Sequence, residues 1–319
     1  MRAIIGACFI IFPVGLILAG CQTITSTWRH ADTFTHEGLL AGSVMDEVDC
    51  HWPDTSLWVM VDGQGECVRF FHAGLSPAND MVHVWFHGDR IVNRENQPYV
   101  IESAYRNNDP KTLRRYAANE LTRFGLPYIR YSRPGAYGSS GDHKDRRLAR
   151  ESRIVNAALN ALKTKFKIKR FALSGQSGGG HVVAALLARR DDIACAVITS
   201  GVVAVRHRMA FRGWTMDATG HSAFYDPIDH AREVMKDKTR RIFIVGDRDD
   251  SNVPFTTQAS YYRALKNAGH RAALIEAQAR GSNHHALSPA GFRIAKWCVD
   301  GDSDGVIRAR LAEWEATRG

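Results

Sequence analysis

The sequence predicts an α/β domain built on a mostly parallel sheet of about eight strands, with helices on both faces. Two observations predict this fold class. Short apolar runs alternate along residues 80–300 with longer stretches of helical periodicity. The apolar runs are nearly continuous, which is typical of strands that are buried on both faces of a parallel sheet. Because no internal repeat or low-complexity segment interrupts the pattern, one large domain is expected over residues 51–319.

The first expected element is a β-hairpin. Residues 57–61 and 67–71 are largely apolar, and residues 62–65, Asp-Gly-Gln-Gly, supply the turn between them. Further elements then follow in order along the chain. The expected strands cover residues 82–86, 128–131, 170–173, 194–199, 241–245 and 272–276. The expected helices lie near residues 111–124, 148–166, 179–187, 228–235, 256–268 and 289–299.

One segment, residues 205–226, breaks this alternation of strands and helices. It is rich in arginine and contains the aromatic residues Phe211 and Trp214. Two interpretations stay open: the segment caps a pocket, or it is a surface connection whose aromatic side chains pack into the core.

A candidate nucleophile follows the expected strand 170–173. Residues 175–179 read Gly-Gln-Ser-Gly-Gly, which matches the pattern G-x-S-x-G, and a helical run begins directly after them. A sharp strand-to-helix turn exposes a serine hydroxyl and crowds the backbone around it, so the flanking positions must be small, and Gly175 and Gly179 meet this requirement. The pattern predicts a nucleophile elbow at Ser177. An ordinary glycine-rich turn or a phosphate-binding loop is the alternative.

A candidate oxyanion hole lies beside this elbow. In an open parallel sheet, ligands gather at the carboxyl ends of the strands, and strand 82–86 ends in His-Gly-Asp at residues 87–89. The glycine lets the backbone turn so that an amide can point into the site. The amides of Asp89 and Gly178 are therefore expected to hold an oxyanion together.

The loop after strand 241–245 supplies the candidate acid. It reads Gly-Asp-Arg-Asp-Asp-Ser-Asn-Val-Pro over residues 246–254, and its carboxylates follow a strand end. Counting from Gly246 favours Asp249, whereas counting back from Pro254 favours Asp250, because the loop is one residue longer than the common form. Asp249 is the preferred acid and Asp250 the alternative.

The candidate base lies past the next strand, in Gly-Ser-Asn-His-His-Ala-Leu at residues 281–287. The order of nucleophile, acid and base along the chain is then Ser, Asp, His. The spacing His-x-Leu into the following helix favours His285, and the spacing Gly-x-x-His favours His284. His285 is preferred, with His284 as the alternative.

With these segments in place, residues 80–300 resemble the α/β-hydrolase superfamily. Residues 133–141, Arg-Pro-Gly-Ala-Tyr-Gly-Ser-Ser-Gly, resemble the R-P-G-x-G-x-S segment of these enzymes. The acid loop, with residues 225–228 before it, is similar to prolyl-oligopeptidase-like and dienelactone-hydrolase-like members. The resemblance implies an eight-stranded sheet and acyl transfer. The extra residue in the acid loop, the doubled histidine and the lack of a preceding β-propeller depart from the peptidase pattern.

The expected reaction is hydrolysis of a carboxylic ester or thioester with a small or medium acyl group, through an acyl-enzyme on Ser177 and without a cofactor. A serine peptidase or amidase of the same fold is one alternative. A non-catalytic envelope lipoprotein that uses the fold as a binding scaffold is another.

The N-terminus predicts export. Residues 1–20 have the charged start and short apolar core of a signal peptide, too short for a comfortable membrane span. They lead into Leu-Ala-Gly-Cys, which resembles the lipobox of bacterial lipoproteins, with Cys21 as the lipidated residue. An ordinary secretory signal or an anchor helix is the alternative. Residues 21–50 would then be a tether, and the enzyme would face the periplasm from a membrane, the outer membrane being favoured by Gln22.

The cysteines agree with an oxidising compartment. Cys50 and Cys67 flank one hairpin-like segment and are the expected disulfide. Cys195 and Cys298 fit a second disulfide or buried free thiols equally well. No cysteine or histidine spacing indicates a zinc site, so no metal is expected. The formal charge of +9 comes from scattered basic residues without a recognisable nucleic-acid module, so nucleic acid is not an expected partner.

Overall fold

The computed structural model describes residues 34–92, 99–106 and 108–317. The expected signal peptide at residues 1–20 and the expected lipidation site, Cys21, lie outside this range. Among the described residues, no helix has both the length and the apolar character that crossing a membrane requires.

The core of the protein is an eight-stranded sheet with the order β1-β2-β6-β3-β7-β8-β9-β10. β2 runs antiparallel to both of its neighbours, and the pairs from β6 to β10 are all parallel. The strand bounds are β1 Ser56–Val61, β2 Gln64–Ala73, β3 Asn79–Phe86, β6 Tyr128–Tyr131, β7 Ile168–Gln176, β8 Ile193–Thr199, β9 Arg241–Gly246 and β10 Ala272–Glu276. The predicted mostly parallel sheet of about eight strands is confirmed.

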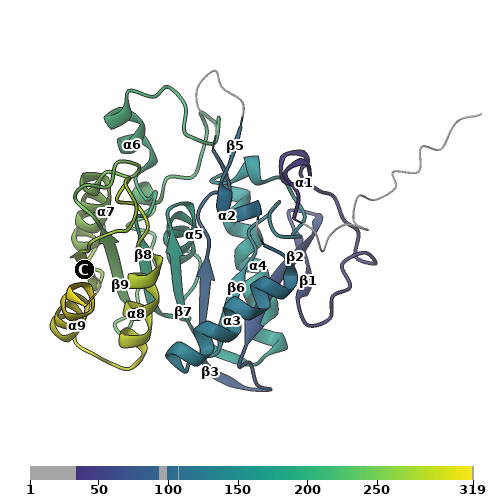
Figure 1. Cartoon of the computed structure of the whole chain (residues 1–319), viewed down its shortest axis with the longest axis horizontal. Coiled ribbons are helices and arrows are strands. Elements are labelled where there is room, and N and C mark those ends of the chain that lie inside the picture. The colour runs from purple at the N-terminus through teal and green to yellow at the C-terminus, as the bar shows by residue number, and fades with distance from the viewer. Residues whose placement is uncertain (1–33, 93–98, 107, 318–319) are drawn as a thin grey trace, which may run out of the picture.

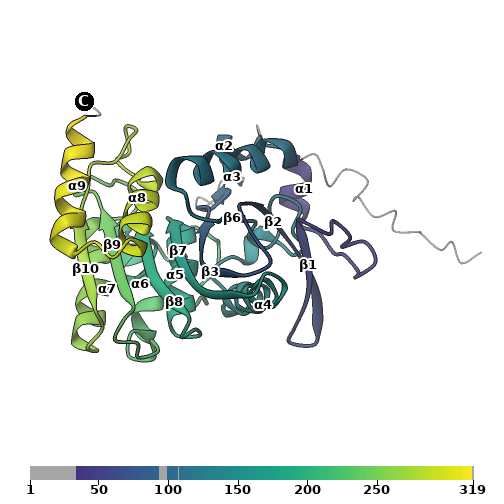
Figure 2. The ribbon, with the colours of Figure 1, turned by 90° about the horizontal axis from the view of Figure 1, so that it is seen from below.

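Helices cover both faces of this sheet (Figures 1 and 2). On one face lie α3 Pro110–Phe124, α8 Ser288–Val299 and the C-terminal α9 Asp304–Ala316. On the other lie α4 Ala149–Lys165, α5 Gly178–Leu187 and α7 Phe255–Asn267. Apolar side chains fill both spaces between sheet and helices: Val155, Leu159 and Tyr261 on the α4 side, and Ile294 and Ile307 on the α8 side. The burial of these faces stabilises the layered arrangement.

The expected helix near residues 228–235 is wrong. The structure has a 3-10 turn, η3, at Pro227–His230, followed by turns. The amide of Met235 donates to the carbonyl of Leu187 at the end of α5, and the carbonyl of Met235 accepts from the Arg240 guanidinium. These tertiary hydrogen bonds replace the local ones that a helix would need.

Several short elements have no counterpart in the expected pattern. They are α1 His36–Ala41, α2 Ser103–Arg106, α6 Val205–Arg212 and a two-stranded sheet of β4 Ile91–Val92 and β5 Val100–Ile101. The described part of the expected tether also packs on the domain, because Leu39 of α1 is buried and Ser43 pairs with Gly141.

Two disulfides cross-link the domain. The expected bond between Cys50 and Cys67 is present. A second disulfide joins Cys195 of β8 to Cys298 near the end of α8, so these two residues are not free thiols in the structure.

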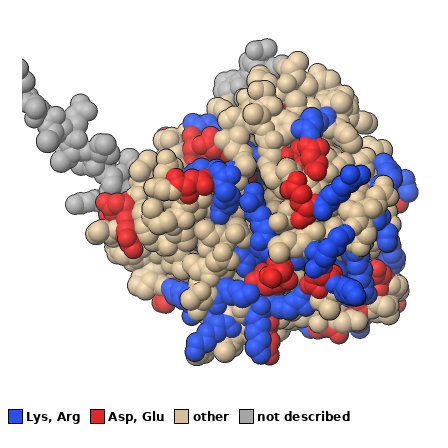
Figure 3. Space-filling model, turned by 180° about the vertical axis from the view of Figure 1, so that it is seen from behind, with Lys and Arg blue, Asp and Glu red and all other residues tan. Residues whose placement is uncertain are grey.

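Basic side chains gather over the lower part of the face shown in Figure 3, with acidic side chains among them. On α4, Arg150 pairs with Glu66 at 2.6 Å, and Arg153 pairs with Asp62 at 2.7 Å. Lys163 of the same helix pairs with Asp192 at 2.6 Å. Acidic neighbours therefore offset part of the positive charge of this helix.

Candidate active site

Ser177 lies at a sharp turn between β7, which ends at Gln176, and α5, which begins at Gly178. Its backbone angles, φ 57° and ψ −117°, are rare for a residue with a side chain, and such strain is typical of a nucleophile elbow. The flanking glycines are required. A Cβ on Gly175 would lie 2.2 Å from the carbonyl oxygen of Gly179, and a Cβ on Gly179 would lie 2.1 Å from that of Phe86. The geometry expected at Ser177 is therefore present.

His285 and Asp250 form a hydrogen-bonded pair near this elbow. The Nδ1 of His285 lies 2.9 Å from Oδ2 and 3.1 Å from Oδ1 of Asp250, whose side chain is fully buried. The amides of Asn252 and Val253 each donate to Oδ1 of Asp250 at 2.8 Å, which holds the carboxylate in place. Because Nδ1 faces a carboxylate, Nε2 is the ring nitrogen left to accept a proton.

The carboxylate that contacts His285 belongs to the alternative acid, Asp250, and not to the preferred one, Asp249. Asp249 is exposed because its amide donates to Oδ1 of Asp247 at 2.9 Å, and this tight turn directs the Asp249 side chain away from His285. The loop thereby accommodates its extra residue without moving the buried aspartate.

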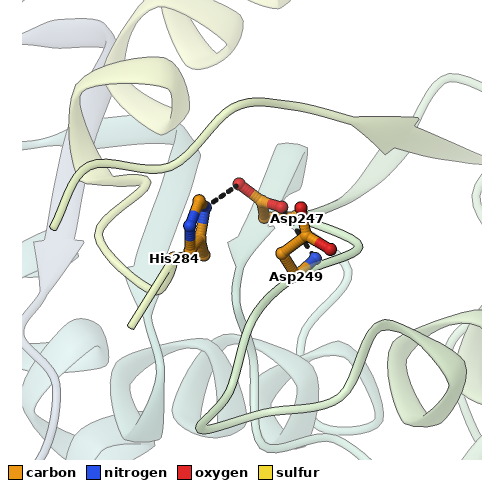
Figure 4. Close-up of side chains that lie close together, drawn as sticks. All are labelled: Asp247, Asp249 and His284. Atoms are coloured by element: carbon orange, nitrogen blue, oxygen red, sulfur yellow. Dashed lines mark hydrogen bonds and ion pairs between the residues drawn. The ribbon is translucent and has the colours of Figure 1, made fainter. Parts of the chain in front are cut away.

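The two adjacent histidines face different aspartates. His284 is exposed, and its Nδ1 lies 3.5 Å from Oδ2 of Asp247 (Figure 4). His285 faces Asp250 instead. The geometry therefore selects His285, the preferred base, as the partner of the buried acid.

Asp247, Asp249 and His284 bring three metal-ligand atoms within 4.8 Å of one another. Sequence spacing gave no sign of this group, because its members come from two loops that are far apart in the chain. Asp247 also accepts hydrogen bonds from the amides of Asp249 at 2.9 Å and Ala279 at 2.7 Å. These bonds give Asp247 a clear role in joining the loop after β9 to the segment after β10.

The loop after β3 lies against the elbow, where the oxyanion hole is expected. A Cβ on Gly88 would lie 3.3 Å from Cβ of Ser177, and a Cβ on Gly178 would lie 1.9 Å from Oδ1 of Asp89. Gly178 is the first residue of α5, so its amide has no acceptor within the helix. This close packing is compatible with the expected pair of donors, the amides of Asp89 and Gly178, whose role stays a prediction.

The carboxylate of Asp89 is held by three arginines. Arg133 lies 3.0 Å and Arg146 3.3 Å from it, and Arg147 also pairs with it. Burial alone would raise the pKa of Asp89, but the charges of Arg147, Arg146 and Arg133 outweigh this effect and hold it well below its usual value. Arg146 and Arg147 are themselves buried, although their sequence context, Lys-Asp-Arg-Arg, is typical of a solvated helix face.

Arg133, from the R-P-G segment, ties this loop to α4. Its Nε donates to Glu151 at 2.7 Å, and its Nη1 donates to the carbonyl of His87 at 3.2 Å. The amide of Arg133 lies 3.3 Å from Nε2 of His87, and Nδ1 of that histidine lies 2.7 Å from the carbonyl of Gly88. His87 therefore carries its proton on Nδ1, and burial lowers its pKa well below the ordinary value. His87, the histidine of the expected His-Gly turn, is therefore neutral, and its ring supports the backbone of the turn through these contacts.

The sequence pattern gives no signal for Gln176, which occupies a variable position of the G-x-S-x-G motif. Its side chain is buried, and its amide nitrogen donates to the carbonyl of His285 at 2.7 Å. Its side-chain oxygen accepts from the amide of Leu287 and from the Thr199 hydroxyl, both at 3.0 Å. Gln176 thus links the residue before the nucleophile to both sides of the histidine loop.

Ser177 and His285 both line a cavity of about 790 Å³. Gly88 and Asp89 form part of its wall, and residues of the segment 205–226 form another part. The contribution of that segment consists of Arg208, Arg212, Trp214, Met216, Asp217, Ala218 and Gly220. Phe211 is 65% exposed and does not pack into the core. This arrangement fits the interpretation of the segment as a cap, with α6 lying above the carboxyl ends of the central strands (Figure 1).

Comparison with known proteins agrees with this geometry. The family model described as prolyl oligopeptidase family matches residues 153–296, which include the elbow, the acid loop and the histidine loop. No curated protein matches the sequence.

Solved structures match most of the chain at low identity. Acylaminoacyl peptidase of Pyrococcus horikoshii has 15% identity and a TM-score of 0.51, and the match covers 83% of this chain but only 40% of the peptidase. The esterase Pf2001 of Pyrococcus furiosus has 15% identity and a TM-score of 0.54, with 85% of this chain and 97% of the esterase covered. Est1E of Butyrivibrio proteoclasticus has 13% identity and a TM-score of 0.52, with 77% and 98% covered.

These similarities and the site geometry lead to one conclusion about the chain. The elbow at Ser177 and the loops that bring Asp250 to His285 lie within the residues that the prolyl oligopeptidase family model matches. The chain has the α/β-hydrolase fold, and the arrangement of its site supports a serine hydrolase.

Proposed function

We propose that the protein hydrolyses a carboxylic ester or thioester through an acyl-enzyme on Ser177. The observation that carries this proposal is the hydrogen-bonded pair of His285 and the buried Asp250, because His285 lines the same cavity as a serine in a strained elbow. A strained serine that lines a cavity together with an oriented imidazole is suited to nucleophilic attack on a carbonyl.

In the proposed mechanism, Nε2 of His285 accepts the Ser177 proton as the hydroxyl attacks the substrate carbonyl. Asp250 keeps Nδ1 protonated and stabilises the imidazolium that forms. The amides of Asp89 and Gly178 donate to the oxyanion, and His285 then protonates the leaving group. Water, deprotonated by the same histidine, releases the acyl group.

Ester hydrolysis is favoured over peptide hydrolysis by the extent of the structural matches. The esterase Pf2001 and Est1E are matched over 97% and 98% of their length, whereas the acylaminoacyl peptidase is matched over 40% of its length. The match to the prolyl oligopeptidase family model favours the second candidate, a peptidase or amidase. Comparing kcat/KM for a 4-nitrophenyl ester and an aminoacyl 4-nitroanilide separates the two.

The test of the nucleophile is labelling with a fluorophosphonate probe, with Ser177→Ala as the matched control. Wild-type protein is expected to be labelled and the variant is not. Equal labelling of both proteins would remove Ser177 from the mechanism. A folded wild-type protein that is neither labelled nor active would favour the binding-scaffold alternative.

We further propose that the enzyme is lipid-anchored through Cys21 in a bacterial cell envelope and faces the periplasm, at the outer rather than the inner membrane. The lipobox-like residues before Cys21 support this, and the two disulfides fit an oxidising compartment. Metabolic labelling with a palmitate analogue, followed by membrane fractionation, tests it. Cys21→Ser should lose the label and leave the membrane fraction, and unchanged labelling of that variant would contradict the anchor.

A further inference from the structure

The cavity that contains Ser177 has a wall with two arginines from the cap. Arg208 and Arg212 lie one turn apart on α6, and both line the cavity together with Trp214. Their guanidinium carbons lie 5.0 Å and 5.7 Å, respectively, from the centroid of the Trp214 ring. Two cations beside one aromatic ring and facing a cavity create a positive potential inside it.

Arg208 is fixed so that one of its nitrogens lacks a hydrogen-bond partner. Its side chain is only 5% exposed, and Nε and Nη2 donate to the backbone and side-chain oxygens of Asn252 at 3.1 Å and 2.6 Å. Nη1 is buried without a hydrogen bond, and it forms an ion pair with Oδ1 of Asp217 at 3.6 Å. A buried charged donor in this state is stabilised by any acceptor that a ligand brings.

Arg212 adds a second N–H group without a hydrogen-bond partner to the same wall. Its Nε is buried without a hydrogen-bond partner, and within the described residues Arg212 forms no ion pair with an acidic side chain. Arg90, which also lines the cavity, has a buried Nε in the same state. The acidic side chains of the wall are Asp89, Glu102 and Asp217.

The buried charges behind this wall do not cancel. Ion pairs connect four guanidinium groups with three carboxylates, which leaves one positive charge in excess: Arg133, Arg146, Arg147 and Arg208 against Asp89, Glu151 and Asp217. Burial, together with the charge of Arg147, lowers the pKa of Arg208 to about 10. Asp217 and Asp89 act in the opposite direction, and their charges do not outweigh the combined effect of burial and Arg147.

We propose that the substrate carries a carboxylate, separate from the carbonyl that Ser177 attacks, and that Arg208 and Arg212 bind it. This inference rests on the proposed function of Ser177. A carboxylate accepts two hydrogen bonds from guanidinium groups in a fixed plane. Trp214 and Met216, also on the wall, provide apolar contact for the part of the substrate between its two ends.

Two esters that differ only in this charge test the inference: 4-nitrophenyl hydrogen glutarate and its neutral methyl ester. The wild-type enzyme is expected to have a kcat/KM about 10- to 100-fold higher for the anionic ester, the effect of hydrogen bonds between charged groups. Arg212→Gln and Arg208→Gln should each lower this ratio about tenfold or more, mainly by raising KM for the anionic ester. Arg212 is partly exposed, so its variant gives a result even where Arg208→Gln fails to fold.

Arg206→Gln is the matched control. Arg206 is also on α6, its side chain is 55% exposed, and it pairs with Asp229 rather than lining the cavity. This variant should keep the wild-type ratio. Equal rates for the two esters in the wild type, or a ratio that Arg212→Gln leaves unchanged, would overturn the inference.

Binding separates failure of this inference from failure of the proposed function. The Ser177→Ala variant is titrated with glutarate, and the same titration is repeated after adding Arg212→Gln. Binding that is lost in the double variant supports the carboxylate site, and tighter binding of inorganic phosphate than of glutarate would contradict the choice of a carboxylate. Glutarate binding without fluorophosphonate labelling of the wild type would leave the anion site standing and remove the hydrolase proposal.

Discussion

Asp250 accepts the Nδ1–H of His285 at 2.9 Å from a position one residue later in its loop than counting from Gly246 predicts. The extra residue is absorbed by the turn in which the amide of Asp249 donates to Asp247. The doubled histidine has a parallel explanation, since His284 faces Asp247 at 3.5 Å. The two departures from the common pattern are thus one structural feature, a second Asp–His contact beside the first.

Replacing the acid gives the first prediction. Asp250→Asn should lower kcat roughly 10⁴-fold, because an amide in this position favours the wrong tautomer of His285. Asp249→Asn is the control and should keep most of the activity, since its side chain is exposed. Ester hydrolysis rates of the two folded variants are compared, and the opposite order would return Asp249 to the triad.

The histidines are distinguished in the same way. His285→Ala should lower kcat by roughly 10⁴-fold or more, since the serine loses its base. His284→Ala removes an exposed side chain and should change kcat only a few-fold. Activity that survives the first substitution but not the second would show that the geometry of the free protein misidentifies the base.

Gln176→Leu tests the link between the nucleophile and the histidine loop. The substitution leaves the buried carbonyl of His285 and the amide of Leu287 without their partner, at a cost of about 1–3 kcal/mol each in the free energy of unfolding. We expect slower fluorophosphonate labelling and a lower kcat, because His285 is less well positioned. Denaturant unfolding and labelling rates are measured together. A less stable variant with an unchanged labelling rate would limit Gln176 to a structural role.

Gly179→Ala should prevent the elbow from forming. The added Cβ would meet the carbonyl oxygen of Phe86 at 2.1 Å, and such overpacking against backbone costs at least about 1–3 kcal/mol. Gly305→Ala in α9 is the control, because its nearest neighbour would lie at 3.9 Å and alanine favours a helix. Thermal unfolding of the two variants should move in opposite directions, and equal melting temperatures would count against the close packing of the elbow.

The Asp89 carboxylate should make stability depend on pH. The pKa of Asp89 is lower in the folded protein than in the unfolded chain. Its ionised carboxylate therefore contributes fully to the free energy of unfolding above the unfolded-state pKa of about 3.9. This contribution is lost as the pH falls from there through the folded-state pKa. Asp89→Asn should cost about 3–5 kcal/mol at neutral pH, because it leaves the buried Arg146 without a carboxylate and removes one of the two carboxylates that Arg133 and Arg147 each contact. The difference between wild type and variant, measured by denaturant unfolding, should shrink as the pH falls below about 4. A difference that is constant with pH would contradict this role.

The sequence was sufficient to predict the sheet and the elbow. All eight strands follow from apolar runs bounded by turns, and Ser177 follows from glycines whose steric necessity the structure bears out. The choice between Asp249 and Asp250 could not be made, because it depends on a turn set by the side chain of Asp247 rather than on spacing.

Long-range side-chain contacts account for the other differences. Gln176 gives no pattern because its partners lie more than a hundred residues away, at His285 and Leu287. The burial of Arg146 and Arg147 depends on Asp89 and Asp217, which come from distant loops. A charged sequence segment is usually solvated, so only the assembled network shows that these arginines are internal.

The disulfide between Cys195 and Cys298 has a consequence for the histidine loop. α8 begins at Ser288, directly after that loop, and its far end is joined to β8 by this covalent bond. Gln176 restrains the near end. The helix is therefore held at both ends, so it can neither slide along the sheet nor rotate about its axis without breaking one of the two attachments. Reduction of the disulfide would remove the covalent part of this restraint and leave the hydrogen bonds of Gln176 as the attachment beside the histidine loop.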